Sequence, residues 1–134
     1  MTSDQTVVGS NPAGGARFFM YNDETLTMKM SHCDRLLKIL KQELSLIYAT
    51  RLRGVYLFGS YARQEQDPES DLDILIVLTD LDSYSSEIKR TSEIISLLSL
   101  EFGITISRYF VREHDWKTYD SPLLRNIREE GIAV

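Results

Sequence analysis

Two short apolar runs joined by a polar connection constrain this chain more than any other feature. The runs are residues 55–58 and 74–78, and the connection between them opens with Gly59-Ser60. Each run has the length and the aliphatic content of a strand that is buried on both faces. The pattern predicts a strand, a tight turn, a helical turn over residues 61–65, a polar loop and a second strand.

The start of the second run carries two carboxylates. Asp71 and Asp73 are two residues apart, so on a strand they lie on one face and Leu72 lies on the other. Two carboxylates on one face repel each other unless a cation lies between them, and Mg²⁺ is the usual partner where phosphates share the site. The sequence therefore predicts Asp71 and Asp73 as ligands of a magnesium ion.

The turn after the first run has the features of a phosphate site. Gly59 has no side chain, so a phosphate can approach its backbone closely. The amides that follow open a helical turn, and free N–H groups at such a start favour an anion. Ser60 adds a hydroxyl donor. Arg63 is the cation beside this turn, and two roles stay open for it: contact with a phosphate, or pairing with Asp71 or Asp67.

The spacing of these residues resembles a known signature. Gly59-Ser60, the spacer 61–70 and then Asp71-Leu72-Asp73 are similar to the pattern of the nucleotidyltransferase superfamily that includes DNA polymerase beta. The Tyr-Ala-Arg after Gly-Ser, the Ser before the first Asp and the late run Ser-Pro-Leu-Leu-Arg-Asn-Ile-Arg-Glu-Glu-Gly resemble the minimal nucleotidyltransferases of bacteria and archaea. The resemblance covers residues 36–134. It implies an α/β fold in which helices pack on a small mixed β-sheet.

The resemblance also implies a function. Members of this superfamily move a nucleoside monophosphate from a triphosphate to a hydroxyl. The minimal ones are commonly antitoxins paired with a small helical HEPN toxin, and some adenylylate a tyrosine of that partner. On this chain Asp71 and Asp73 would be the catalytic metal ligands, and Gly59, Ser60 and Arg63 would bind the phosphates of ATP. The expected activity is therefore Mg²⁺-dependent transfer of AMP from ATP to a tyrosine of a HEPN-type partner.

One departure concerns a third carboxylate that active members carry on a later strand. That strand is expected at residues 104–111, where the polar face offers Thr105 and Ser107. Glu113 and Asp115 follow it and are the remaining candidates. A neutral hydroxyl supplies neither a charge nor an effective base near neutral pH. Three alternatives therefore stay open: a non-catalytic nucleotide-binding subunit, a subunit that neutralises a toxin by contact, and a small-molecule, antibiotic-type nucleotidyltransferase.

Length and composition limit the class of protein. The 134 residues suffice for one domain, and we expect a disordered tail over residues 1–28 before a nucleotidyltransferase domain over 29–134. The net charge of −5 argues against extended contact with nucleic acid. Cys33 is the only cysteine, which excludes an intrachain disulfide. No apolar run has the length of a membrane span and no signal peptide is evident, so we expect a cytoplasmic protein. The sequence leaves open whether it forms a homo-oligomer or a hetero-oligomer.

Capping residues mark the remaining helices. A first helix is expected over 31–49 with Ser31 as its N-cap. A second long helix is expected to begin at the N-cap Asp82 and to end at Gly103.

The end of the chain is expected to form a short helix and a small edge strand. Ser121 has the chemistry of an N-cap, Leu123 and Ile127 are expected to face inward, and Gly131 is expected to stop the helix before the edge at 132–134.

Two further features admit two interpretations each, and one residue departs from the family pattern. Arg51 and Arg53 either attract a nucleotide or are solvated charges at a strand edge, and the second is the commoner case. His114, Trp116 and Tyr119 are expected on an exposed loop, where they form either a satellite cluster, which is favoured, or a surface for a partner or a stacked base. Gln64 stands where small family members often have glycine.

Overall fold

A computed structural model describes residues 24–134 of the chain. Helices and strands follow one another in the order α1 (Glu24–Tyr48), the 3-10 turn η1 (Ala49–Arg51), β1 (Leu52–Phe58), β2 (Leu72–Leu78), α2 (Tyr84–Phe102), β3 (Ile106–Arg112), α3 (Glu113–Thr118), α4 (Pro122–Glu130) and β4 (Ile132–Ala133). The predicted α/β fold, in which helices pack on a small mixed sheet, is confirmed.

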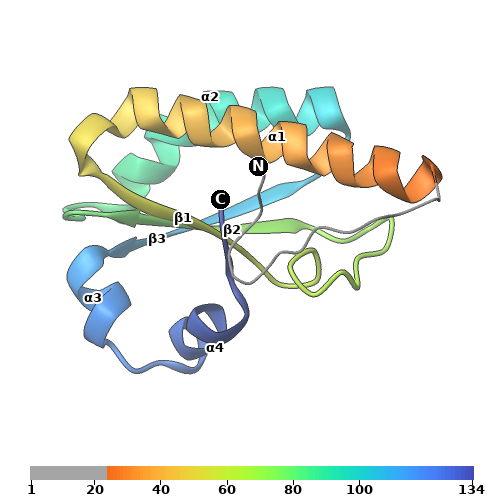
Figure 1. The fold of residues 1–134 in the computed structure, drawn as a ribbon. Coiled ribbons are helices and arrows are strands. Elements are labelled where there is room, and N and C mark those ends of the chain that lie inside the picture. Colours follow the sequence, from red (N-terminus) through yellow and green to blue (C-terminus); the bar gives the residue numbers. More distant parts are fainter. Residues whose placement is uncertain (1–23) are drawn as a thin grey trace.

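The sheet has four strands in the order β3-β2-β1-β4. β1 is antiparallel to both β2 and β4, and β2 is parallel to β3, which α2 connects to it as a crossover. Helices α1 and α2 cover one face of the sheet, and α3 and α4 lie on the other face (Figure 1). The loop that joins β1 to β2 leaves the sheet at the end opposite α3 (Figure 1).

Apolar side chains of β2 are buried on both faces, as the uninterrupted run 74–78 predicts. On one face Ile74 and Ile76 pack in the main core together with Leu40 of α1. On the other face Leu75 lies in a second cluster with Ile127 of α4. Because the strand interior is apolar throughout, its polar side chains are confined to its beginning, where the loop delivers the chain to the sheet.

The first helix begins earlier than predicted. α1 starts at Glu24 and continues through Ser31, so that Ser31 lies inside the helix and is not its N-cap. The added turns are rich in Leu, Met, Lys and Glu, which are strong helix formers. Residues 24–28 of the expected tail are therefore helical, and the rest of that expected tail lies outside the described residues.

The second helix is displaced by one residue from its predicted cap. Ser83, not Asp82, is the N-cap of α2, and its hydroxyl accepts a hydrogen bond from the amide of Ser86. At the other end Gly103 adopts the left-handed conformation with φ 67°, as predicted.

The C-terminal helix has the predicted caps but a different inner face. Ser121 caps α4 by accepting a hydrogen bond from the amide of Leu124. Leu124 and Ile127, three residues apart, are buried, whereas Leu123 is 45% exposed, so the prediction for Leu123 was wrong. The expected edge strand after Gly131 is β4.

A short helix occupies the stretch that was expected to be a loop. Trp116 of α3 packs on Tyr56 of β1 with ring centroids 4.8 Å apart, which confirms the satellite cluster for Trp116, whereas Tyr119 is 60% exposed. Arg53 is an exposed charge of β1, as predicted, and pairs with Glu113, whereas Arg51 is half-buried and pairs with Asp80 and Glu87. In the described part of the chain, no helix has the length and apolar character needed to cross a membrane.

Candidate active site

The Gly-Ser corner lies against the carboxylate of Asp73. Phe58, the last residue of β1, is in register with Asp73 of β2, so the next residue, Gly59, turns directly over that side chain. Gly59 has φ +79°, and a Cβ atom placed on it would lie 2.3 Å from Oδ2 of Asp73. Only glycine fits there, both for its backbone conformation and for the space it leaves.

The turn after Gly59 is closed by its own backbone hydrogen bonds. The amide of Arg63 donates to the carbonyl of Gly59 at 3.2 Å, and the amide of Glu65 donates to that of Ser60 at 2.8 Å. The predicted helical turn is thus a single hydrogen-bonded turn that does not continue as a helix. Across the described residues, the amides at positions 60–62 have no hydrogen-bond acceptor. Successive unpaired amides of this kind suit an anion.

The two predicted carboxylates differ in exposure. Asp71 precedes β2 and is exposed, whereas Asp73 lies in the strand and is half-buried. Burial raises the pKa of Asp73, the neighbouring charge of Asp71 raises it further, and Arg63 lowers it. Within the described part of the chain no group donates a hydrogen bond to the Asp73 carboxylate. A half-buried carboxylate without a donor and beside a like charge is stabilised by a cation.

Ser107 occupies the β3 position next to these carboxylates. It is in register with Asp73, and its hydroxyl donates to Oδ2 of Asp71 at 3.3 Å. Thr105 precedes β3, and its carbonyl accepts a hydrogen bond from the amide of Leu72. Of the four candidates for the missing acid, Ser107 is therefore the residue that the sheet brings to Asp71 and Asp73.

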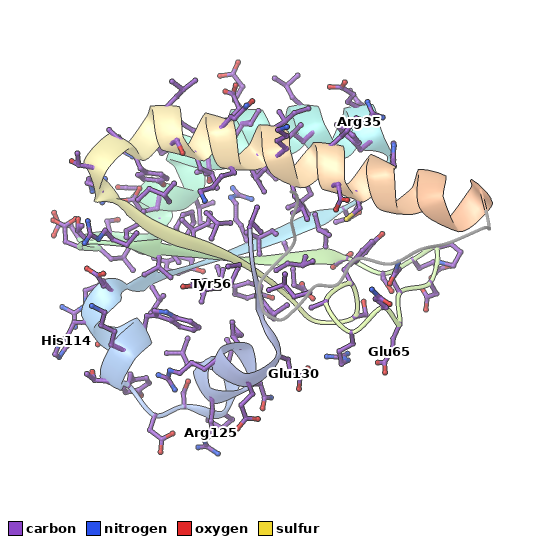
Figure 2. All side chains as sticks on the ribbon, viewed as in Figure 1. Arg35, Tyr56, Glu65, His114, Arg125 and Glu130 are labelled. Carbon is purple, nitrogen blue, oxygen red and sulfur yellow. The ribbon has the colours of Figure 1, made fainter. Side chains whose placement is uncertain are left out.

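The acidic candidates Glu113 and Asp115 lie elsewhere. Both belong to α3, which follows the far end of β3. Glu113 pairs with Arg53 and Lys117, and Asp115 pairs with Arg112. In Figure 2, His114 marks α3 at the end of the molecule away from Glu65, which lies in the loop after β1. The expectation that either acid could join the site is wrong, because a seven-residue strand separates them from it.

The side chain of Arg63 pairs with carboxylates other than those predicted. Its Nε lies 2.9 Å from Glu65, and its Nη1 lies 3.4 Å from Glu130 at the end of α4. Neither Asp71 nor Asp67 is its partner. Both ion pairs are exposed. Exposed pairs of this kind contribute little stability, so a stronger anion can replace them.

The donor set fits a magnesium ion shared with phosphates. No cluster of three or more His, Cys, Asp or Glu side chains occurs among the described residues, so the site is not an all-protein metal cage. Mg²⁺ binds through one or two carboxylates and completes its shell with waters and substrate phosphates. Asp71 and Asp73 supply such a pair, and the Gly59 corner lies directly against Asp73.

A mixed sheet whose first hairpin sets a Gly-Ser corner against an Asp-x-Asp pair defines the class of nucleotidyltransferases. A family model described as the nucleotidyltransferase domain matches residues 33–134. The chain belongs to this family. A relative from Methanocaldococcus jannaschii, named as a candidate protein adenylyltransferase, is 32% identical over 99 residues, which are 74% of this chain and 95% of that protein.

Solved structures share the fold. A candidate nucleotidyltransferase from Sulfolobus solfataricus superposes with a TM-score of 0.52 at 20% identity, covering 78% of this chain and 83% of the other. A chain in a crystal structure of a toxin–antitoxin complex with AMP-PNP superposes with a TM-score of 0.51 at 23% identity, covering 73% of this chain and 70% of the other. At this identity the two comparisons support the fold alone.

Proposed function

We propose that this nucleotidyltransferase moves AMP from ATP to a hydroxyl, using Mg²⁺ held by Asp71 and Asp73. The observation that supports this most directly is the contact between the Gly59 backbone and the Asp73 carboxylate, which leaves no room for a side chain. A phosphate that approaches the bare backbone there lies next to a carboxylate with no hydrogen-bond donor. Phosphate and carboxylate can share that space only when a cation joins them.

Each residue of the site would have a separate role in binding the phosphates or the metal. Gly59 and Ser60 would seat the β- and γ-phosphates through the backbone amides at 60–62 and the serine hydroxyl. Arg63, released from its exposed pairs, would neutralise the outer phosphates. Asp71 and Asp73 would hold the α-phosphate in place through the shared metal. Bound magnesium would supply neutralisation of the charge that grows on the α-phosphate and on the leaving pyrophosphate.

The chemical step is an in-line displacement. The acceptor oxygen forms a bond to the α-phosphorus, the bond from that phosphorus to the oxygen bridging the β-phosphate breaks, and pyrophosphate leaves with the electron pair. The acceptor proton must go to solvent, because Ser107 is a poor base where active relatives carry a carboxylate. A phenol, with an ordinary pKa of about 10, loses its proton far more readily than an aliphatic alcohol. The site therefore suits a tyrosine.

We propose a HEPN-type toxin as the protein that carries this tyrosine. The sequence resemblance to minimal nucleotidyltransferases supports the pairing, as does the name of the M. jannaschii relative, which makes a protein the acceptor. One structural neighbour comes from a toxin–antitoxin complex with an ATP analogue, which agrees with both a toxin and a nucleotide. We place the reaction in the cytoplasm, where ATP and magnesium are abundant.

Transfer of labelled AMP to the partner tests the proposal. The protein is incubated with ATP labelled at the α-phosphate, Mg²⁺ and the HEPN-type protein encoded beside it. We expect label on a tyrosine of the partner, and none with Asp73→Asn or when EDTA is added. Asp67→Asn is the matched control, because Asp67 lies in the same loop and, among residues 24–134, forms hydrogen bonds only with its neighbours Glu69 and Ser70. Label on an aminoglycoside instead would assign the antibiotic-type activity.

A second candidate function is nucleotide binding without transfer. Ser107 favours it, because the hydroxyl that bonds Asp71 is neutral and supplies no third charge to the metal. Tight binding of ATP and Mg²⁺ to the protein, together with an unlabelled partner over hours of incubation, would establish this second function. Tight association with the partner that needs no nucleotide would instead assign neutralisation by contact.

A further inference from the structure

We propose that Tyr109 binds the acceptor side chain as it approaches the α-phosphate. This inference rests on the proposed function and names the residue that receives the acceptor, which neither the sequence pattern nor the relatives indicate.

The strand order sets the side from which the acceptor comes. In an in-line displacement the acceptor oxygen and the leaving oxygen lie on opposite sides of the phosphorus. The corner that would hold the leaving pyrophosphate follows β1, and the carboxylates stand at the start of β2, the strand between β1 and β3. With pyrophosphate on the β1 side, the acceptor must approach over β3.

Two side chains of β3 are open on that face before the sheet is covered. Ser107 is in register with Asp73, and Tyr109 follows on the same face of the strand, in register with Leu75. Val111, the next residue on this face, is buried in the cluster that α4 covers. Tyr109 is thus the last open side chain between the carboxylates and the part of the sheet that α4 closes.

The ring of Tyr109 packs on Phe58 and remains partly exposed to solvent. Its centroid lies 5.6 Å from that of Phe58, with the ring planes at 57°, and Phe58 is itself buried. Tyr109 remains 38% exposed. Because the ring is already packed, little conformational entropy is lost when a ligand rests on it. An incoming tyrosine would gain an aromatic contact that orients its hydroxyl toward the α-phosphate.

Two other roles for Tyr109 make different predictions. If its ring supports the base of ATP, its loss weakens ATP binding. If it is simply an aromatic residue on an edge strand, its loss changes stability but neither KM. Steady-state kinetics separate these roles, because the acceptor and ATP are varied independently.

The experiment compares Tyr109→Ala, Tyr109→Leu and Tyr109→Phe, with the HEPN-type protein and labelled ATP as substrates. Tyr109→Leu keeps an apolar side chain against Phe58, so it still tests the role of the ring if the alanine variant does not fold. Thermal melts verify the fold of each variant. We expect the alanine and leucine variants to raise KM for the acceptor about 10-fold, with kcat and KM for ATP within about twofold of wild type. Tyr109→Phe keeps the ring and stays within about twofold in all three constants. Tyr119→Ala, which removes a 60% exposed tyrosine elsewhere, is the matched control.

The outcomes distinguish this inference from the function on which it rests. Unchanged KM for the acceptor in the alanine and leucine variants, or a raised KM for ATP, overturns the role of Tyr109 while transfer itself stands. A wild-type protein that labels no partner overturns the proposed function, and the inference with it.

Discussion

Replacing Ser107 by aspartate should add a third carboxylate to the candidate site. Ser107 is the β3 residue in register with Asp73, and its hydroxyl already contacts Asp71 at 3.3 Å. A carboxylate there would lie on the same face of the sheet as the two existing acids. The variant is therefore expected to gain metal affinity and catalytic rate at the expense of stability when no metal is bound.

The cost in stability follows from the short distance between a carboxylate at position 107 and those of Asp71 and Asp73. Two unit charges 4 Å apart repel by about 1 kcal/mol in water and by about 4 kcal/mol near a protein surface. Asp71 is exposed, so its repulsion of the new carboxylate should be near the lower energy. Asp73 is half-buried, so its repulsion should be larger. We expect Ser107→Asp to lower the free energy of unfolding by about 1 to 3 kcal/mol in EDTA. For a domain of this size that corresponds to a fall in Tm of roughly 3 to 10 °C.

Magnesium should reverse this loss. A third ligand charge raises metal affinity, and metal at 100 times its Kd stabilises the folded state by about 2.7 kcal/mol. A base beside the acceptor contributes typically 10²- to 10⁴-fold, so we expect AMP transfer to rise by about 10²-fold. Thermal melts with and without Mg²⁺, and initial rates of label transfer, measure the two effects. Ser107→Asn, neutral and similar in size to aspartate, is the control. Equal responses of the two variants to Mg²⁺ would refute the placement of Ser107 beside the metal.

Three other perturbations test single contacts. Gly59→Ala must displace the Asp73 side chain and adopt a strained φ, so we expect a loss of about 1 to 2 kcal/mol by urea unfolding and no measurable binding of ATP with Mg²⁺ by calorimetry. Gln64 has φ 58°, so Gln64→Gly should relieve strain and raise the urea midpoint by the equivalent of about 0.5 kcal/mol; an unchanged or lower midpoint would contradict this. Burial of Glu87 opposes its charged form, but hydrogen bonds from Arg51 and Tyr48 outweigh the burial and lower the pKa of Glu87. The ionised Glu87 therefore stabilises the fold above the ordinary glutamate pKa, and this stabilisation is lost as the pH falls below that value. Glu87→Gln should cost about 3 kcal/mol near pH 7 and flatten the acid limb of the stability profile, and an equally steep acid limb would contradict this assignment.

The candidate site could be predicted because its determinants are local. Gly59 and Asp73 lie on the two arms of one hairpin, so the lengths of the two apolar runs and of the connection nearly fix their approach. The alternation of side chains on a strand then places Asp71 and Asp73 on one face. None of this needs knowledge of how distant segments pack.

Features that depend on distant segments could not be predicted. Arg63 pairs with Glu130, which is 67 residues away in the sequence. Glu87 is an ordinary helix residue by sequence, and it is buried because Tyr48 and Arg51, from another part of the chain, donate to it. The capping residues predicted both ends of α4. They could not predict which leucine is buried, because the buried face depends on the angle at which the helix meets the sheet.

The C-terminal tail supports the Gly59 corner from the side away from the carboxylates. β4 pairs with Tyr56 and Leu57, the residues of β1 just before the corner, so the tail fixes the end of the strand from which Gly59 turns. The turn into β4 is tight, because a Cβ on Gly131 would lie 2.5 Å from the carbonyl oxygen of Ile127. This same turn directs Glu130 of α4 toward Arg63. A triphosphate that drew Arg63 away, as we propose, would have to break that pair, and this would couple the end of α4 to occupation of the corner.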